Sequence, residues 1–199
     1  MNIRKWIAYN IGYRFFGCLY NSTHDPLFDF IESKIPQEFF DRKILDLGCG
    51  DGANTKRIER VFRTKNIIGF DRNVSLLKRA RKKGQKVEKF DLDKDLPNGE
   101  IAAFTFSLHH AKNKEKTLDE TVKKFNYIFL CEPIRGLYHI FFDAGEPLNK
   151  ADWVMLFDNY LKKYTLHQYK NNLIVFYHKT EAVEAISKPM KNNKTVRAS

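Results

Sequence analysis

The sequence predicts one α/β domain built on a mostly parallel sheet, with helices on both faces and an antiparallel β-hairpin at its C-terminal side. Short apolar runs alternate with helix-length amphipathic segments between residues 43 and 133, a pattern typical of βαβ units. Two further strand-like runs flank residues 170–172 and predict the hairpin. The length of 199 residues, 43% of them hydrophobic, suits a single globular domain.

The N-terminal segment is predicted to be helical. Residues 2–20 place large apolar or aromatic side chains at four-residue intervals, which is an amphipathic helical pattern. A second helix over 25–35 begins with the helix-starting pair Asp25 and Pro26. We expect residues 1–36 to form a helical cap over the ligand site.

The middle of the chain is predicted to supply the sheet. Residues 37–180 form the main domain, and residues 181–199 form a polar, basic tail without fixed structure. The asparagines of the turn at 170–172 tolerate the left-handed conformation that a tight hairpin requires. The predicted strands are 43–48, 66–71, 85–91, 101–108, 126–133, 164–169 and 173–179, and the predicted helices between them are 53–62, 74–83, 114–125 and 151–163.

Composition narrows the classes of partner and compartment. The formal net charge of +11 favours polyanionic partners such as RNA or an anionic membrane surface. A biased genome composition, which raises the frequency of lysine and asparagine, would produce the same excess of positive charge. Cys18, Cys49 and Cys131 are widely spaced, which indicates neither a disulfide framework nor a metal site. We therefore expect a reducing, cytoplasmic setting, and we find no membrane-spanning run or secretory signal in the sequence.

A glycine-rich turn follows the first predicted strand. In ILDLGCGDG (residues 44–52), Gly48, Gly50 and Gly52 let the backbone approach a ligand closely. Open α/β sheets bind ligands at this position, outside the carboxyl ends of the strands. Asp71 ends the second predicted strand and can accept hydrogen bonds from ribose hydroxyls, while Asp91 ends the third and can reach an adenine amino group. Together these strand ends predict an adenosine-binding pocket.

Two adenosine ligands compete for this pocket. Dinucleotide sites use a G-x-G-x-x-G turn and present a helix N-terminus to a pyrophosphate. Here the spacing is G-x-G-x-G, and Asp46 stands two residues before the first glycine. A carboxylate at that point opposes a pyrophosphate but suits a cation, such as the ammonium or sulfonium group of S-adenosylmethionine.

Five segments of the chain resemble, in the same order, the motifs of the class I S-adenosylmethionine-dependent methyltransferases. Within that family, the chain is most similar to the small-molecule methyltransferases whose fourth strand ends in Leu-His-His. The segments are ILDLGCGDGANT, IIGFDRN, KFDLDKDLP, FSLHHAKN and YIFLCEP. The resemblance covers roughly residues 40–180 and implies a Rossmann-like, seven-stranded, mostly parallel sheet. One departure is the start of the fourth strand, where these relatives carry Phe-Asp and this chain has Glu100 followed by Ile-Ala-Ala.

The resemblance also implies which residues bind the cofactor. Asp46, Gly48 and Gly50 would border the methionine part, Asp71 the ribose, and Ser107 and Leu108 the sulfonium. Asp91 and Leu92 would contact the adenine. The full predicted set is Asp46, Gly48, Cys49, Gly50, Gly52, Asp71, Arg72, Asp91, Leu92, Ser107 and Leu108, with no metal ligand.

Methyl transfer from a sulfonium depends mainly on alignment of the nucleophile, methyl carbon and sulfur, and a general base is optional. His109 and His110 follow the fourth strand and Glu132 ends the fifth, so all three are candidate catalytic residues at the pocket edge. Each also has a structural alternative, since an imidazole can bond a backbone carbonyl and Glu132 can accept nearby loop amides. Residues 134–150, with several aromatic side chains, are predicted to contribute to an acceptor pocket.

Three functions follow as hypotheses. The first is methylation of a small-molecule or lipid-like acceptor, and the second is methylation of tRNA or rRNA, suggested by the charge of +11. Against RNA base methylation, no Asn-Pro-Pro-Tyr or Asp-Pro-Pro-Tyr segment follows the fourth strand. The third, a non-catalytic partner subunit, is disfavoured because the three acids at the strand ends are intact. The aromatic and basic N-terminal helix could also touch a membrane surface, and the sequence leaves the oligomeric state open.

Overall fold

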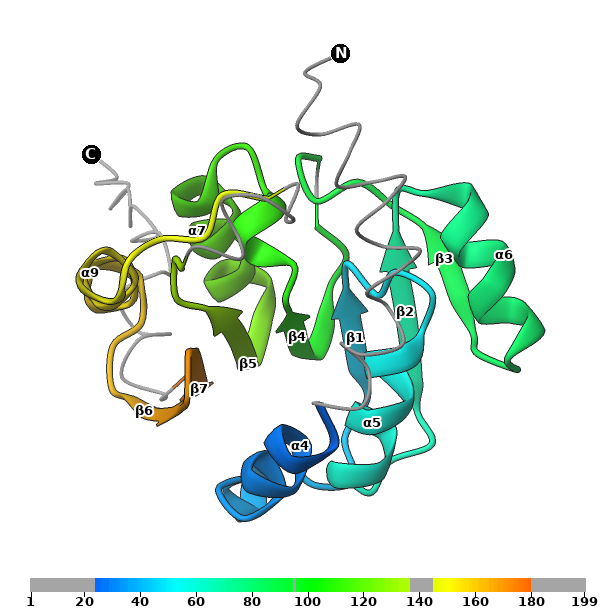
Figure 1. Cartoon of the computed structure of the whole chain (residues 1–199), viewed down its shortest axis with the longest axis horizontal. Coiled ribbons are helices and arrows are strands. Elements are labelled where there is room, and N and C mark those ends of the chain that lie inside the picture. Colours follow the sequence, from blue (N-terminus) through cyan, green and yellow to red (C-terminus); the bar gives the residue numbers. More distant parts are fainter. Residues whose placement is uncertain (1–23, 95, 137–144, 180–199) are drawn as a thin grey trace, which may run out of the picture.

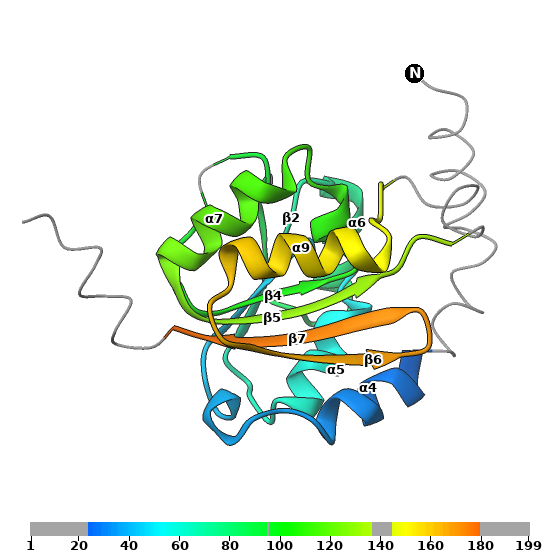
Figure 2. The same ribbon diagram turned by 90° about the vertical axis from the view of Figure 1, so that its left-hand side faces the viewer.

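The computed structural model describes residues 24–94, 96–136 and 145–179, which form a sheet with helices packed on both of its faces (Figures 1 and 2). In this described part the sheet has seven strands, in the order β3-β2-β1-β4-β5-β7-β6. The strands are β1 (Ile44–Leu47), β2 (Ile67–Asp71), β3 (Val87–Lys89), β4 (Gly99–Thr105), β5 (Phe125–Pro133), β6 (Tyr164–Tyr169) and β7 (Asn172–His178).

The five strands β1 to β5 are parallel, and β7 runs antiparallel to both of its neighbours, β5 and β6. The predicted mostly parallel sheet with a terminal antiparallel hairpin is thus confirmed. The hairpin turns through Lys170 and Asn171, and its left-handed residue is Lys170 (φ 50°) rather than an asparagine. The expectation that asparagine supplies the left-handed conformation was therefore wrong.

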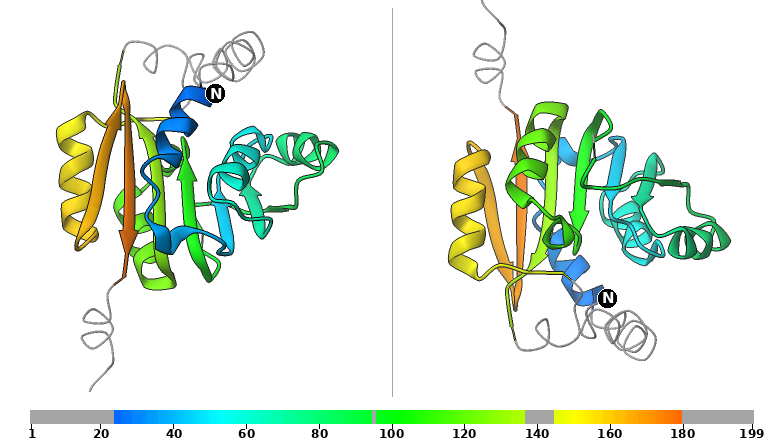
Figure 3. Two further views of the ribbon diagram at one scale, coloured as in Figure 1. Left: turned by 90° about the horizontal axis from the view of Figure 1, so that it is seen from below. Right: turned by 90° about the horizontal axis from the view of Figure 1, so that it is seen from above.

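Helices cover both faces of the sheet. Helices α7 (Lys114–Lys124) and α9 (Lys150–Tyr160) lie on one face, and α4 (His24–Glu32) and α5 (Ala53–Val61) lie on the other (Figure 2). Helix α6 (Val74–Lys82) packs beside β2 and β3, so α6 and α9 stand at opposite ends of the sheet (Figure 3).

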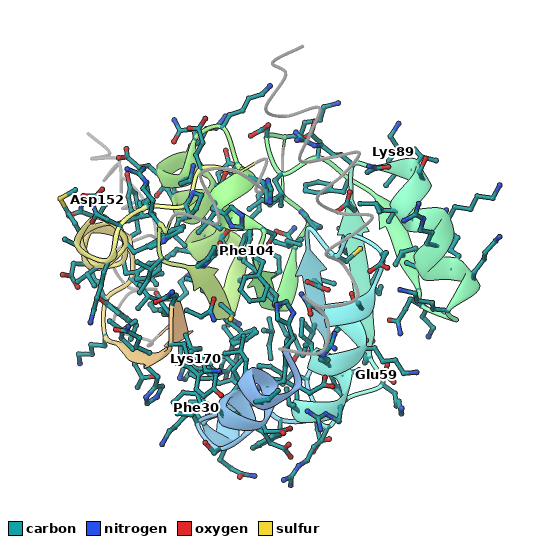
Figure 4. The ribbon with its side chains drawn as sticks, viewed as in Figure 1. Phe30, Glu59, Lys89, Phe104, Asp152 and Lys170 are labelled. Atoms are coloured by element: carbon teal, nitrogen blue, oxygen red, sulfur yellow. The ribbon has the colours of Figure 1, made fainter. Side chains whose placement is uncertain are left out.

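The central strands are buried on both faces, which explains their continuous apolar runs. In β4, Ile101 and Ala103 pack against the α4–α5 side, whereas Ala102 and Phe104 pack against the α7–α9 side. Phe104 lies near the middle of the molecule (Figure 4). Each side of the sheet therefore has its own apolar core.

Local signals in the sequence account for most helix starts. Asn73, Asn113 and Asn149 each precede a helix and accept hydrogen bonds from backbone amides of its first turn. Strand ends agree less well with prediction: the third strand is only Val87–Lys89, and the fourth ends at Thr105. The chain turns at that point into a short 3₁₀-helix, η3 (Leu108–His110), because the backbone leaves the sheet after Phe106 (φ 57°).

Several predicted features lie outside the described residues: the helix over 2–20, the basic tail over 181–199, and the aromatic residues of the predicted acceptor segment between 137 and 144. Among the helices of the described ranges, none has the length and apolar character needed to cross a bilayer.

Candidate cofactor and catalytic site

The glycine turn leaves β1 and leads into α5 at the carboxyl edge of the sheet. Gly48, Gly50 and Gly52 all have positive φ (91°, 57° and 78°), a conformation that favours glycine. The amides of Gly48 and Cys49 both donate to the carbonyl of Phe70, at 2.7 and 2.9 Å, which ties the turn to β2. The backbone of the turn is therefore fixed by its neighbours.

Two of these glycines make room for the protein itself. A Cβ on Gly48 would lie 2.4 Å from the Cβ of Ser107, and one on Gly52 would lie 3.0 Å from Cγ of Gln85 and 3.2 Å from Cβ of Ala80. Packing within the protein therefore already requires glycine at Gly48 and Gly52, and this reason could not be seen in the sequence alone. Gly48 allows the loops after β1 and β4 to touch, and Gly52 allows α5 to start beside α6.

Asp71, at the end of β2, organises the turn. Its Oδ2 accepts the amide of Gly50 at 2.9 Å, and its Oδ1 accepts the amide of Asn73 at 2.7 Å. The Asp71 side chain is half-buried. A carboxylate has about four acceptor directions, so each oxygen can accept a second hydrogen bond from a ligand hydroxyl.

Asp46 is buried beneath the turn, with 1% of its surface exposed. Its Oδ2 accepts a hydrogen bond from Oγ1 of Thr55 at 2.5 Å. Burial, with a smaller contribution from the charge of Asp71, raises the pKa of Asp46 to about 7, although the Thr55 hydroxyl acts in the opposite direction. A nearby cation would offset this burial and favour the ionised form. Thr55 belongs to this site but was not among the residues predicted from the sequence. Its position in the first turn of α5, directly after the glycine turn, could have indicated that it lies near Asp46.

The third acid and its neighbours lie along the same edge. Asp91 and Leu92 are half-buried, and Oδ1 of Asp91 accepts the amide of Asp93 at 3.2 Å. Arg72 is exposed and lies 4.0 Å from the carboxylate of Asp93. The structure thus brings Asp46, Asp71 and the Asp91 segment to one edge of the sheet, as predicted.

Cys49 has a different environment. Its side chain is buried with Leu77, Ala80 and Val87 under α6, and a Cβ on Gly69 would lie 2.8 Å from its Sγ. Burial, together with the charges of Asp46 and Asp71, raises the pKa of this thiol. Cys49 therefore offers the site its backbone, while its side chain packs in the protein.

Ser107 links the loop after β4 to the glycine turn. Its Oγ donates to the carbonyl of Leu47 at 2.5 Å, and its amide donates to Oε1 of Glu132 at 3.0 Å. The same Oε1 accepts the amide of Leu108 at 2.8 Å. Both Ser107 and Leu108 are buried, and Ser107 lies directly against Gly48 of the first turn.

The two histidines differ in accessibility. His109 is 2% exposed, and its Nδ1 lies 2.6 Å from Oε2 of Glu132, which is itself fully buried. His110 is half-buried, and its ring centroid is 4.2 Å from that of His109. Gly145 passes so close that a Cβ there would lie 2.2 Å from Cδ2 of His109. The sequence reading missed Gly145, because nothing in its local pattern indicates a contact with residues so far away in the chain.

A second group of polar residues borders the edge from the α4 side. The ring of His24 stacks on Phe106 with centroids 4.8 Å apart, and its Nδ1 lies 3.2 Å from Oδ1 of Asn54. Burial lowers the pKa of His24. The buried hydroxyl of Thr105 has no hydrogen-bond partner within the described ranges.

These residues fit a positively charged adenosine cofactor. Asp71 retains acceptor capacity suited to ribose hydroxyls, and Asp46 places a carboxylate whose burial a cation would compensate. A pyrophosphate would meet repulsion from the same two acids. Within the described residues, no cluster of three or more His, Cys, Asp or Glu side chains could hold a metal ion.

Comparison with known proteins agrees with this chemistry. Residues 44–125 match the sequence family described as "Methyltransferase domain". No curated protein sequence matches the chain.

Solved structures share the fold at low sequence identity. The YcgJ protein of Bacillus subtilis is 14% identical with a TM-score of 0.58, over 73% of this chain and 71% of that one. Human N-acetylserotonin methyltransferase, solved in complex with S-adenosylmethionine, is 17% identical with a TM-score of 0.65, over 80% of this chain and 53% of that one. An S-adenosylmethionine-dependent methyltransferase of Mesorhizobium loti is 14% identical with a TM-score of 0.59, over 78% and 97%. The chain thus spans only about half the length of the human enzyme.

The strand order and the glycine turn followed by acids at successive strand ends agree with the family match. Residues 44–125 therefore match a methyltransferase domain, and the described residues have the Rossmann-like fold of the methyltransferases named above, with a site whose residues fit S-adenosylmethionine.

Proposed function

We propose that the chain transfers the methyl group of S-adenosylmethionine to a small-molecule or lipid-like acceptor. The observation that carries this proposal is the acidic character of the carboxyl edge, where Asp46 and Asp71 lie at the ends of β1 and β2 and Asp91 follows β3. Carboxylates so close to the cofactor repel a phosphate backbone, whereas a small acceptor need not carry phosphates to the site.

The cofactor residues take the following proposed roles. Asp46 faces the cationic end of the cofactor, Asp71 accepts the ribose hydroxyls, and Asp91 with Leu92 contacts the adenine. Ser107 and Leu108 border the sulfonium. Gly48, Cys49, Gly50 and Gly52 contribute backbone, and Arg72 lies at the rim. Their gathering at one edge of the sheet supports this assignment.

For catalysis, S-adenosylmethionine supplies an electrophilic methyl group, and the residues of this chain align the acceptor with it. His110, which is half-buried at the same edge, is the proposed general base for an acceptor that must lose a proton. His109 and Glu132 are buried beside it and act through their hydrogen bonds.

Calorimetry with S-adenosylhomocysteine, followed by transfer of labelled methyl groups to separated metabolite, lipid and RNA fractions of a cell extract, tests this function. We expect cofactor binding and label in the metabolite or lipid fraction. Asp71→Ala should weaken cofactor binding and reduce the label transferred, whereas Asp119→Ala on the exposed face of α7 should change neither. Label confined to RNA would refute the small-acceptor proposal.

RNA remains a second candidate because basic residues without an ion pair in the described ranges lie together around α6 and β3. On the α4–α5 side, arginines are paired with acids: Arg57 with Asp25 at 2.7 Å and Arg60 with Asp29 at 2.8 Å. Around α6 and β3, six exposed basic residues form no ion pair within the described ranges, and one of them, Lys89, ends β3 beside Asp71 (Figure 4). These six are Lys78, Arg79, Arg81, Lys82, Lys86 and Lys89.

Salt dependence distinguishes a functional RNA surface from a solvated helix face. If RNA binds there, its affinity falls steeply with salt, and the double variant Lys78→Glu/Lys82→Glu reduces both the affinity and the salt slope. The matched control is Lys116→Glu/Lys123→Glu on α7, whose lysines already pair with Glu120 and Asp119. Equal effects of the two double variants would mean that α6 is no specific RNA surface.

We also propose a reducing, cytoplasmic location. Cys49 and Cys131 are both buried and unpaired with each other, which suits such a compartment. Contact of the N-terminal segment with a membrane surface is a further proposal that concerns residues outside the described ranges.

A further inference from the structure

Glu132 occupies an unusual position at the end of β5. Its side chain is fully buried, and four donor groups converge on its two oxygens. Oε1 accepts the amides of Ser107 (3.0 Å) and Leu108 (2.8 Å), while Oε2 meets the amide of His109 at 3.4 Å and Nδ1 of His109 at 2.6 Å. One carboxylate thus holds three successive residues of the loop after β4.

The loop adopts a shape that needs such an anion. Phe106, just before these amides, has a φ of 57°, which is unfavourable for a residue with a side chain. A left-handed residue turns the following amides toward one side, where they form a concave site for an anion. Burying a carboxylate costs several kcal/mol unless such donors compensate for it. An apolar side chain could fill the same space in the core at a lower free-energy cost. The charge is therefore explained by the loop that it holds.

This loop also sets the position of the glycine turn. Ser107 donates to the carbonyl of Leu47, and its Cβ lies against the α-carbon side of Gly48. A displacement of the loop after β4 consequently moves Ser107 away from the turn on which the cofactor is bound. The hydrogen bonds run in sequence from Glu132 to Ser107 and from Ser107 to the end of β1.

Glu132 also determines the protonation of the His109 ring. An ionised carboxylate only accepts hydrogen bonds, so Nδ1 of His109 carries a hydrogen and donates it to Oε2. Gly145 packs against the other edge of the same ring, and the amide of Glu146 donates to the carbonyl of His109 at 3.0 Å. The ring is thereby fixed between β5 and the returning chain.

We propose that Glu132 is a positioning residue for methyl transfer, which fixes the loop after β4 against the glycine turn and holds His109 with its hydrogen on Nδ1. It acts through Ser107, Leu108 and His109 and does not itself touch the acceptor. This inference rests on the binding of S-adenosylmethionine at the glycine turn, and it holds for any acceptor.

The test is Glu132→Gln, which keeps the shape but replaces one acceptor oxygen by a donor NH₂. Whichever way the amide is oriented, either His109 or the Ser107–Leu108 amides face a donor. We expect the ring ¹⁵N signals of His109 to show loss of the Nδ1 hydrogen, or the amides of Ser107 and Leu108 to lose protection from hydrogen exchange. We also expect affinity for S-adenosylhomocysteine to fall about tenfold, the equivalent of one unsatisfied buried group.

The matched control is Glu146→Gln, an exposed acid on the neighbouring segment whose contact with His109 is made by its backbone. It should leave the ring signals, the exchange rates and the affinity unchanged. If Glu132→Gln alters only the melting temperature and leaves the affinity of the folded protein at the wild-type value, Glu132 is merely structural and the proposal is refuted.

A second variant covers the case in which Glu132→Gln does not fold. Ser107→Ala removes the hydrogen bond to Leu47 without disturbing the carboxylate, and it should also weaken S-adenosylhomocysteine binding several-fold; an unchanged affinity would overturn the proposal. Failure of the unmodified protein to bind S-adenosylhomocysteine would instead contradict the cofactor assignment. The ring signals of His109 report on Glu132 without any bound cofactor, so the two failures are distinguishable.

Discussion

Asp46→Asn should stabilise the cofactor-free protein at alkaline pH while it weakens cofactor binding. Asparagine has nearly the same shape, and its carbonyl oxygen can still accept the hydrogen bond from Thr55. The substitution removes only the charge that the protein buries. Stability and cofactor affinity should therefore change in opposite directions.

The size of the effect follows from the pKa of Asp46. One pKa unit corresponds to about 1.4 kcal/mol, so a rise from 3.8 to about 7 on folding corresponds to about 4 kcal/mol. Because the folded state holds the proton more tightly than the unfolded state, this stability is present at pH 4 and is lost as the pH rises to about 7. The variant lacks this loss, although an unpartnered NH₂ group would cost it about 1 to 3 kcal/mol at every pH.

Denaturant unfolding of the cofactor-free protein between pH 4.5 and pH 8 measures the effect. We expect the difference between variant and wild type to grow in favour of the variant by several kcal/mol over this range. Asp119→Asn, at an exposed site on α7, is the control and should not change the pH dependence. Parallel stability curves for Asp46→Asn and wild type would refute the reasoning, as would an S-adenosylhomocysteine affinity unaffected by the substitution.

Three other substitutions test the site and its supports. Asp71→Ala should weaken S-adenosylhomocysteine binding by about 2 to 3 kcal/mol in calorimetry, since it removes charged acceptors from the ligand and the turn; a loss below about 0.5 kcal/mol would contradict the ribose assignment. Gly48→Ala should destabilise the fold by at least about 2 kcal/mol in urea unfolding, because its Cβ would lie 2.4 Å from Ser107 and its φ is 91°. Trp153→Phe should cost about 1 to 3 kcal/mol in the same assay, since the carbonyl of Pro133 loses its buried partner; an unchanged midpoint would show that this bond is unimportant.

Much of the fold was predictable because its signals are local. The buried central strands are short apolar runs, and three helices begin at an asparagine that caps them. The strand-end acids could be placed at one edge because parallel strands end on the same side of a sheet. The edge strand β3 was predicted too long, since only Val87 of its three residues is buried and the apolar pattern there is weak.

The reasons behind individual site residues were less predictable. Gly48 was explained by ligand approach, whereas its space is taken by Ser107, 59 residues later in the chain. The contacts of Glu132 with the Ser107–His109 loop likewise depend on which strands are neighbours in the sheet. Sequence identifies residue types at strand ends, but only the three-dimensional arrangement shows what they touch.

The pairing of β5 has a consequence for biosynthesis. Its free edge is covered by β7, which begins nearly forty residues after β5 ends. While α9 and β6 are being translated, the edge of β5 that later pairs with β7 has unsatisfied backbone N–H and C=O groups. Such an unpaired apolar edge promotes association between nascent chains. We therefore expect ribosome-bound chains stalled before residue 172 to engage chaperones, and chains that have fully exposed β7 outside the exit tunnel to release them.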